Sequence, residues 1–334
     1  MIVRDVVVEG DVRLAGSLCL PDDSRPDAGW PAVLLLGGTG GDTRDGDLAP
    51  ERSPGVVDPP KRGMLRHIAH HLAGLGIASL RCDKRGCGAS GGTATSSDYD
   101  TDLVDNLAAL EALAATPGVD LARVALAGHS AGAYNACLMC RERPTAVAAV
   151  GLLSALHEPI DDLLRRNWCR IAAGWDTFTK ERRQWLIANR PSDVVGSFRM
   201  EDFIAAARGG DDWVDLEAHG IVQRFSLVRF RQDLWRPCAP AFDHVRVPAL
   251  VLHGSADLNV DMADAFDTYG RLVVNGNEAV TLVVLAGLDH SYRTVPADVA
   301  ERIWERVSLM CFAGPTSPLA LDAIGSWAAG VLQA

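Results

Sequence analysis

The sequence lacks long apolar runs, an excess of positive charge and an apolar leader. No apolar stretch approaches about 18 residues, which excludes a helix that spans a bilayer. The first 21 residues carry charges where a secretory leader needs an apolar block, and they predict a hairpin turned near Glu9 to Asp11. The net charge of −11 argues against a nucleic-acid partner. We therefore expect a cytoplasmic protein with no membrane span and no nucleic-acid partner, and the oligomeric state stays open.

The pattern of cysteines also lacks the regularity of a disulfide framework or a metal centre. Eight cysteines occur at irregular spacing in a chain of 334 residues, which is typical of free thiols. Cys137 and Cys140 form a C-x-x-C on one face of a predicted helix, but no second C-x-x-C or H-x-x-H completes a zinc site. We interpret both as small buried residues, and we predict no metal and no cofactor.

The sequence does contain an alternation of buried strands and helices. Hydrophobic residues make up 48% of the chain, which is enough for a large core. Strand-like runs occur at 32–38, 77–83, 123–130, 146–155, 247–257 and 280–290. Because helical stretches separate these runs, we predict an α/β fold, with a mostly parallel central sheet flanked by helices. In such a sheet the functional groups lie at the carboxyl ends of the strands.

One long segment interrupts this alternation. It reads as helical, without a core strand, and contains five of the eight tryptophans, namely Trp168, Trp175, Trp185, Trp213 and Trp235. The predicted parts are 1–156, the first part of the core with the N-terminal hairpin; 157–243, a helical lid insertion; 244–314, the second part of the core; and 315–334, a C-terminal helical tail. The tryptophans indicate packing of the lid on the core, with some lining an apolar pocket. The arginines of the lid are typical of a solvated face, with anion binding as the alternative.

The stretch VALAGHSAGAYNACL, residues 124–138, places a serine between glycines where a strand gives way to a helix. Its centre, 128–132, fits G-x-S-x-G, the sharp turn that exposes a nucleophilic serine. The two glycines keep Cβ atoms out of the crowded turn, and the serine takes an uncommon backbone conformation. We therefore predict that Ser130 is a catalytic nucleophile.

A nucleophilic serine needs a base, and the base needs a carboxylate that holds its tautomer. His290 follows the last core strand, and Asp257 ends the preceding one, so both lie at the edge of the sheet where the serine is expected. The chain order serine, aspartate, histidine is that of one known hydrolase fold. We predict His290 as the base and Asp257 as the acid, with Asp261 and Glu158 as alternative acids. Asp289 adjoins the histidine and is expected to point away.

An oxyanion hole needs backbone N–H groups aimed at the developing charge. One is the amide of Ala131, at the N-terminus of the helix after the serine. We assign the other to Thr39 in the glycine-rich loop after the first core strand, with Gly40 as the close second. A phosphate-binding loop is the alternative reading of this segment, but the Lys-Ser/Thr of a P-loop is missing.

Two loops carry a family resemblance. GGTGGDTRDGD at 37–47 and RCDKRGCGASGG at 81–92 resemble the bacterial carboxylesterases of the α/β-hydrolase superfamily, which have a G-S-G-P-x-D-R-D-G loop. The resemblance covers about residues 30 to 155 and 244 to 295. It implies an α/β-hydrolase fold and a serine carboxylesterase. Gly37 stands where the superfamily often has His, and Thr43 where this branch usually has Asp. The resemblance implies structural, loop-tying roles for Arg44, Asp45, Asp83 and Arg85.

These observations predict a serine hydrolase that cleaves a carboxylic ester through an acyl-enzyme. The expected substrate is a small-molecule ester or thioester with an apolar part, and its candidate contacts are Gly40, His129, Trp168 and Trp175. Thioesterase, lactonase, or acyltransferase and tailoring chemistry on the same triad remain open, because fold and triad do not separate them. A non-catalytic binding protein of the same fold is the alternative from another class.

Overall fold

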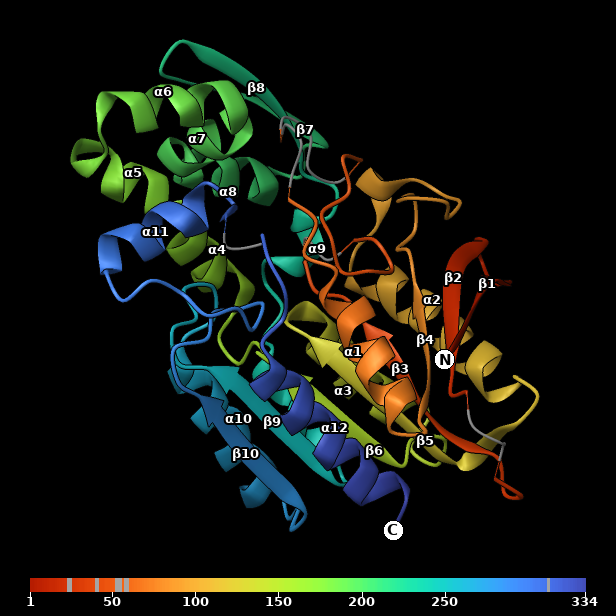
Figure 1. Cartoon of the computed structure of the whole chain (residues 1–334). Helices are drawn as coiled ribbons and strands as arrows, with labels where there is room; N and C mark the ends of the chain where they lie inside the picture. The colour runs from red at the N-terminus through yellow and green to blue at the C-terminus, as the bar shows by residue number, and fades with distance from the viewer. Residues whose placement is uncertain (23–25, 40–41, 52–55, 57–59, 311–312) are drawn as a thin grey trace.

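The computed structural model describes residues 1–22, 26–39, 42–51, 56, 60–310 and 313–334. One eight-stranded sheet, in the order β1-β2-β4-β3-β5-β6-β9-β10, forms its centre (Figure 1). The strands are β1 (Ile2–Val8), β2 (Leu14–Leu20), β3 (Trp30–Leu36), β4 (Ala78–Cys82), β5 (Val119–His129), β6 (Ala149–Leu153), β9 (Ala249–Gly254) and β10 (Val280–Leu285). The hairpin β1–β2 is antiparallel and pairs antiparallel with β4, while the strands from β4 to β10 run parallel. The predicted mostly parallel α/β sheet is confirmed.

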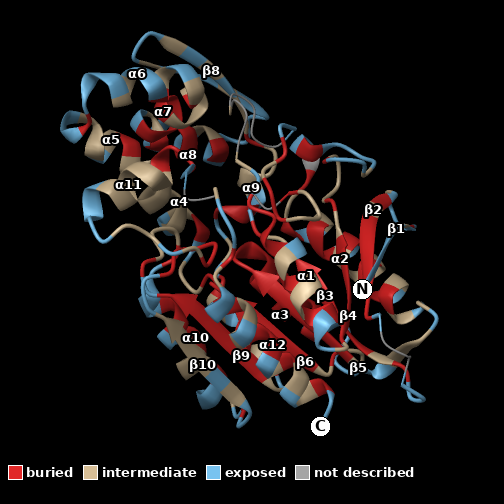
Figure 2. Ribbon diagram, viewed as in Figure 1, coloured by how far each residue is buried: buried red, intermediate tan, exposed pale blue. Residues whose placement is uncertain are grey.

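Helices cover both faces of the sheet because its central strands are apolar on both sides. In β3, Leu34 and Leu36 belong to one buried cluster, while Val33 and Leu35 belong to the other. The first cluster includes residues of α2 (Tyr99–Ala114), α3 (Ala131–Glu142) and α10 (Met262–Val274). The second includes residues of α1 (Met64–Gly74) and α12 (Pro318–Leu332). The strands β3, β6 and β9 are accordingly buried along almost their whole length, and β5 is buried from Val124 to His129 (Figure 2).

The segment 157–243 follows β6 and precedes β9 in the chain, and most of it lies beyond one end of the sheet (Figure 1). Its last element, η3 (Ala239–His244), packs instead against α3 and α10 of the core. The segment comprises α4 (Ile160–Trp168), α5 (Arg170–Gly174), η2 (Trp175–Thr177), α6 (Lys180–Asn189), α7 (Pro191–Phe198), α8 (Met200–Gly209), β7 (Trp213–Ala218), β8 (Ile221–Ser226), α9 (Phe230–Asp233) and η3 (Ala239–His244). A helix from the second part of the core, α11 (Val299–Val307), packs against it: Val307 shares a buried cluster with Ile171 and Phe178.

The inserted segment is not wholly helical, in contrast to the sequence expectation. Strands β7 and β8 form an antiparallel hairpin from Trp213 to Ser226. Its turn residues His219 and Gly220 both have positive φ, 53° and 75°, as a tight two-residue hairpin turn requires. The apolar–polar alternation of WVDLEA and the His-Gly pair were the available signals. They are weak because the hairpin is short and packs on α7 and α8 rather than joining the sheet.

Two further findings concern the described residues only. None of their helices has the length and apolar character needed to cross a membrane. Seven cysteines fall within the described ranges, and all are free thiols. Cys137 and Cys140 are buried on α3, and burial raises the pKa of the Cys140 thiol to about 12.

Candidate active site

The turn between β5 and α3 holds Ser130 in a strained conformation. Its φ is 56° and its ψ is −122°, outside the regions that a serine normally occupies. Both flanking glycines are sterically required: a Cβ on Gly128 would lie 2.2 Å from the oxygen of Gly132, and one on Gly132 would lie 2.4 Å from the oxygen of Leu36. The backbone N–H of Ser130 donates to Leu153 of the neighbouring strand β6. This crossing of strand, turn and helix is the geometry expected of a nucleophile elbow.

The structure brings Asp257 and His290 together at the ends of β9 and β10. The distance from His290 Nδ1 to Asp257 Oδ2 is 2.7 Å. The other carboxylate oxygen, Oδ1, accepts the backbone N–H groups of Asn259 and Val260 at 2.7 and 3.0 Å. Burial opposes ionisation of this carboxylate, but the charge and hydrogen bond of His290 and the Val260 amide outweigh it and hold its pKa at about 2. An ionised Asp257 fixes the imidazole ring with Nδ1 toward the acid.

The alternative acids lie elsewhere. Asp261 accepts from the N–H of Ala263 and caps α10. Glu158 forms an ion pair with Arg166. Asp289 is buried and accepts the N–H groups of its own loop. Each of these carboxylates therefore has a structural contact away from the His290 ring.

His129 ties the loop of His290 to the nucleophile turn. Its Nε2 lies 2.7 Å from the carbonyl oxygen of His290, and the two rings are 4.6 Å apart. Burial and the neighbouring His290 and Arg62 hold the pKa of His129 well below its usual range, so the neutral ring donates from Nε2. His129 is 1% exposed and lines none of the pockets described below. This position differs from the expected contact with substrate.

The glycine-rich loop packs directly on the serine. A Cβ on Gly38 would lie 2.6 Å from the Cβ of Ser130. Lys84 Nζ donates to the carbonyl oxygen of Gly38 at 2.8 Å. Because C=O and N–H point in opposite directions across a peptide bond, this contact turns the N–H of Thr39 away from Lys84. The contact of Lys84 was not predicted from the sequence, although Lys84 lies in the RCDKRG segment at the end of a core strand. Gly40 lies outside the described residues.

Ala131 is buried at the first position of α3, where backbone N–H groups lack helical partners. Thr39 is exposed, and its side chain is hydrogen-bonded to Tyr99. The loop residues with implied structural roles form ion pairs around this region: Arg44 with Asp83 at 2.8 Å, and Arg85 with Asp105 at 2.8 Å.

The inserted segment contacts the loop that carries Asp257, residues 255–261, here called the acid loop. Asn167 Nδ2 and Arg166 Nη2 donate to the carbonyl oxygen of Asn259 at 2.8 and 3.0 Å. Arg170 donates to the carbonyl oxygen of Leu258. Sequence reasoning missed these contacts, because α4 and the acid loop are about 90 residues apart in the chain.

A cavity of about 340 Å³ lies between the inserted segment and the core. Its aromatic lining residues are Trp168, Trp213, Phe225 and Phe230, and its arginines are Arg190, Arg224, Arg229 and Arg306. Thr39 of the glycine-rich loop also lines it. Of the two tryptophans expected to contact substrate, Trp168 lines this cavity. Trp175 instead packs against Phe198 and His219.

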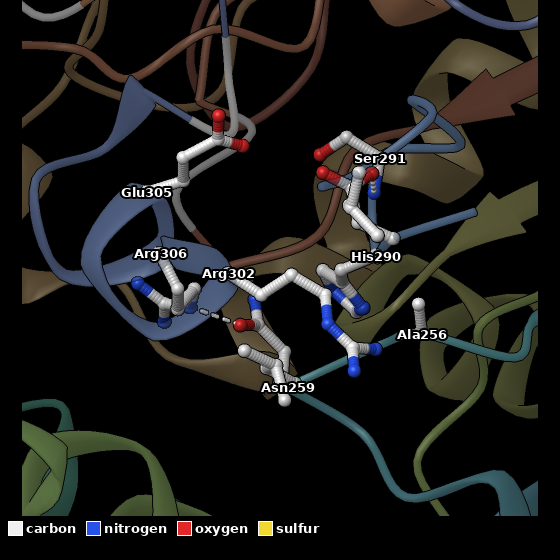
Figure 3. A pocket seen from close by; sticks show the side chains of 10 residues that line it. Ala256, Asn259, His290, Ser291, Arg302, Glu305 and Arg306 are labelled. Carbon is white, nitrogen blue, oxygen red and sulfur yellow. Dashed lines mark hydrogen bonds between the residues drawn. The ribbon is translucent and has the colours of Figure 1, made fainter. Parts of the chain in front are cut away.

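A second, smaller pocket of about 20 Å³ adjoins His290 (Figure 3). Its walls are the acid loop, the loop of His290 and the helix α11. Asn259 and Arg306 line both this pocket and the large cavity, so the two share a wall. Within the described ranges, no group of three His, Cys, Asp or Glu side chains is arranged to hold a metal ion.

Comparisons with known proteins complete the description. The family described as serine aminopeptidase, S33, matches residues 61–293. An uncharacterized protein of Mycobacterium tuberculosis (strain ATCC 25618 / H37Rv) is 29% identical over 215 residues, which are 61% of this chain and 67% of that protein.

Solved structures share the fold at low identity. The α/β hydrolase GrgF from Penicillium sp. sh18 is 17% identical, with a TM-score of 0.62 and all of both chains covered. The Pyrococcus furiosus esterase Pf2001 is 16% identical, with a TM-score of 0.57, over 99% of this chain and 92% of its own. Est1E from Butyrivibrio proteoclasticus, solved with ferulic acid bound, is 17% identical, with a TM-score of 0.54, over 91% of this chain and 97% of its own. The predicted α/β-hydrolase fold is confirmed.

Proposed function

The chain belongs to the serine aminopeptidase S33 family of α/β-hydrolases, and on that premise we propose that it hydrolyses a carboxylic ester through an acyl-enzyme. The observation that carries the proposal is the contact of 2.7 Å between His290 and Asp257, in a loop that His129 ties to the turn of Ser130. Esterases of the same fold, such as Pf2001 and Est1E, support the choice of ester chemistry.

In the proposed mechanism, Ser130 Oγ attacks the ester carbonyl while His290 Nε2 takes its proton. The ionised Asp257 stabilises the imidazolium that forms. The amides of Ala131 and Thr39 donate to the oxyanion of the tetrahedral intermediate. His290 then protonates the leaving oxygen, and the C–O bond breaks to give the acyl-enzyme. Water, deprotonated by His290, attacks this second ester and releases the acid and Ser130.

The cavity supports a substrate with an apolar or aromatic part. Its volume of about 340 Å³ lies within the range of small-molecule sites. Its lining combines aromatic rings with charged groups, and Thr39 connects it to the serine through the adjoining Gly38.

The test is hydrolysis of p-nitrophenyl esters of increasing acyl length, with Ser130→Ala beside the wild type. We expect turnover with a chain-length optimum, and a loss of about 10⁴-fold or more in kcat for the variant, because the nucleophile is removed. A fluorophosphonate probe is expected to label the wild type and not the variant.

Aminoacyl p-nitroanilides and acyl thioesters are assayed in parallel. If an anilide or a thioester is turned over faster than the matched ester, the protein would be assigned as an amidase or a thioesterase instead of an esterase. A folded wild type that neither turns over an ester nor takes up the probe would overturn the proposed function.

A further inference from the structure

Two arginines of α11 line the small pocket beside His290 (Figure 3). Arg302 and Arg306 are one helical turn apart, so both project from the same side of the helix. The Nε of Arg302 is buried and has no hydrogen-bond partner. Arg306 Nε donates to the neutral side-chain oxygen of Asn259. Within the part of the chain that the structure describes, neither guanidinium forms an ion pair with a carboxylate.

Two carboxylates line the same pocket, Glu305 and Asp289, and their bonds are to other groups than the two arginines. Glu305 forms an ion pair with Arg293. Asp289 accepts the backbone N–H groups of Ser291 and Arg293 at 2.9 and 2.8 Å, and Arg293 Nε lies 3.9 Å from it. Arg293 is therefore the arginine that pairs with both acids, although Oδ2 of Asp289 has no hydrogen-bond partner. Among the described residues, the two arginines of α11 form no ion pair with either acid.

A third arginine increases this concentration of positive charge. Arg170 of the inserted segment bonds the carbonyl oxygen of Leu258, and its own Nε is buried without a partner. Burial and the charges of Arg306 and Arg166 lower its pKa to about 10. Arg166 differs from these residues because it forms an ion pair with Glu158. Arg170, Arg302 and Arg306 thus lie together around the acid loop, which itself carries Asp257 and Asp261.

The position of these arginines beside His290 indicates which part of a substrate they would contact. His290 protonates the leaving oxygen in the proposed mechanism, so the alcohol part of the ester lies on the His290 side. Arg306 lines both the small pocket and the large cavity, so a ligand in the cavity reaches these arginines along their shared wall. The small pocket has a volume of about 20 Å³, room for about one water-sized group.

Building on the proposed function, we propose that Arg302 and Arg306 bind a carboxylate on the alcohol part of the substrate ester. The planar guanidinium presents N–H groups in a fork that matches a carboxylate. The two arginines therefore determine substrate specificity, and they take no part in the proton transfers.

The test uses two butanoate esters that differ by one carboxylate. 4-Nitrophenyl butanoate releases 4-nitrophenol, and 5-butanoyloxy-2-nitrobenzoate releases the same phenol with an added carboxylate. The quantity measured is the ratio of kcat/KM for the charged ester to that for the neutral ester. We expect a ratio above one in the wild type and a fall of about tenfold in Arg302→Gln, as for the loss of one charged hydrogen bond. Arg302→Lys restores part of the ratio, because it keeps the charge without the fork.

The matched control is Arg208→Gln, which removes an exposed arginine that stacks on Trp235. Its ratio is expected to equal that of the wild type. An unchanged ratio in Arg302→Gln would overturn the proposal. A preference for 4-nitrophenyl hemisuccinate that Arg302→Gln abolishes would also overturn it, because the carboxylate would then lie on the acyl part.

Binding separates this proposal from the proposed function. Calorimetry on Ser130→Ala compares 5-hydroxy-2-nitrobenzoate with 4-nitrophenol. If 5-hydroxy-2-nitrobenzoate binds more tightly than 4-nitrophenol, and Ser130→Ala/Arg302→Gln loses this difference, the result supports the anion site. This holds even if the wild type hydrolyses no ester. Such a lack of hydrolysis would reject only the esterase assignment. Equal binding of the two phenols would overturn the anion site while leaving the esterase assignment intact.

Discussion

The sheet core and the inserted segment 157–243 hold their charged groups in different ways. In the core, the side chains of Asp257 and His290 are 1% and 9% exposed and 2.7 Å apart. The inserted segment also holds exposed pairs, such as Arg199 and Asp202, which are 40% and 55% exposed. Exposed pairs contribute at most about 1 kcal/mol and adopt many geometries, whereas a buried, fully bonded pair has one. The core is therefore suited to chemistry that needs fixed distances.

The two regions meet at the acid loop, and this contact makes the comparison testable. Side chains of the inserted segment donate to the carbonyl oxygens of Leu258 and Asn259, while Asp257 in the same loop accepts from His290. Changes in the core are expected to remove activity, and changes in the inserted segment to reduce it or alter its selectivity.

The largest of the effects compared here is expected for Asp257→Asn. An amide at this position favours the wrong imidazole tautomer and no longer stabilises the imidazolium, so we expect kcat to fall by about 10³ to 10⁴-fold. The control is Asp261→Asn, which changes the cap of α10 on the same loop. Steady-state hydrolysis of p-nitrophenyl butanoate measures both. If kcat falls equally in the two variants, Asp257 is not the acid that orients His290.

Gly38→Ala is expected to act next most strongly. The new Cβ would lie 2.6 Å from the Cβ of Ser130 and 2.7 Å from the oxygen of His129, so the glycine-rich loop must shift. We expect a fall in kcat/KM of about 10²-fold, comparable to the loss of one oxyanion donor.

The matched control for this variant is Gly74→Ala, where a Cβ on α1 meets nothing within 4 Å. Thermal unfolding of both variants separates a local shift from a loss of fold. Full activity in a folded Gly38→Ala would contradict the close packing of the loop on the serine.

Asn167→Ala tests the contribution of the inserted segment. Removing the bond to the Asn259 carbonyl loosens the acid loop, and we expect kcat to fall by about tenfold, since small displacements of catalytic groups are costly. Asn189→Ala removes an exposed bond of the same type, to Trp185, and is expected to behave as the wild type. If both variants keep full kcat, the inserted segment does not position the acid.

The smallest effect concerns Glu158, at the start of the inserted segment. Burial raises its pKa to about 7, and nearby aspartates add to this, although Arg166 opposes it. A carboxyl whose pKa is higher in the folded state stabilises the fold below its unfolded pKa, and this stabilisation is lost as the pH rises through about 7.

Urea unfolding at pH 5 and pH 8 measures this effect. We expect the free energy of unfolding to fall less between these values in Glu158→Gln than in the wild type, by about 1 kcal/mol, because partial exposure weakens the burial effect. Parallel curves for the two proteins would show that Glu158 titrates normally.

Much of the architecture was predictable because it depends on local pattern. Apolar strands separated by helices predict a parallel sheet, and such a sheet brings the residues at its strand ends to one edge. Asp257 and His290 are predicted for that reason, and the structure brings them within hydrogen-bond distance, whereas G-x-S-x-G predicts Ser130. The hairpin from Trp213 to Ser226 was missed because its short alternating strands pack outside the sheet.

The strained turn at Ser130 follows from local sequence, because only glycine fits at positions 128 and 132. The sheet follows from local sequence too, because periodicity specifies which faces of a strand are buried. The roles of residues whose partners lie far away in the chain depend on how distant elements pack. Lys84 meets Gly38 and Asn167 meets Asn259 only in the folded chain. Among the described residues, Arg302 forms no ion pair and its Nε has no hydrogen-bond partner. Contacts of this kind follow from the packing of distant elements, which no local pattern encodes.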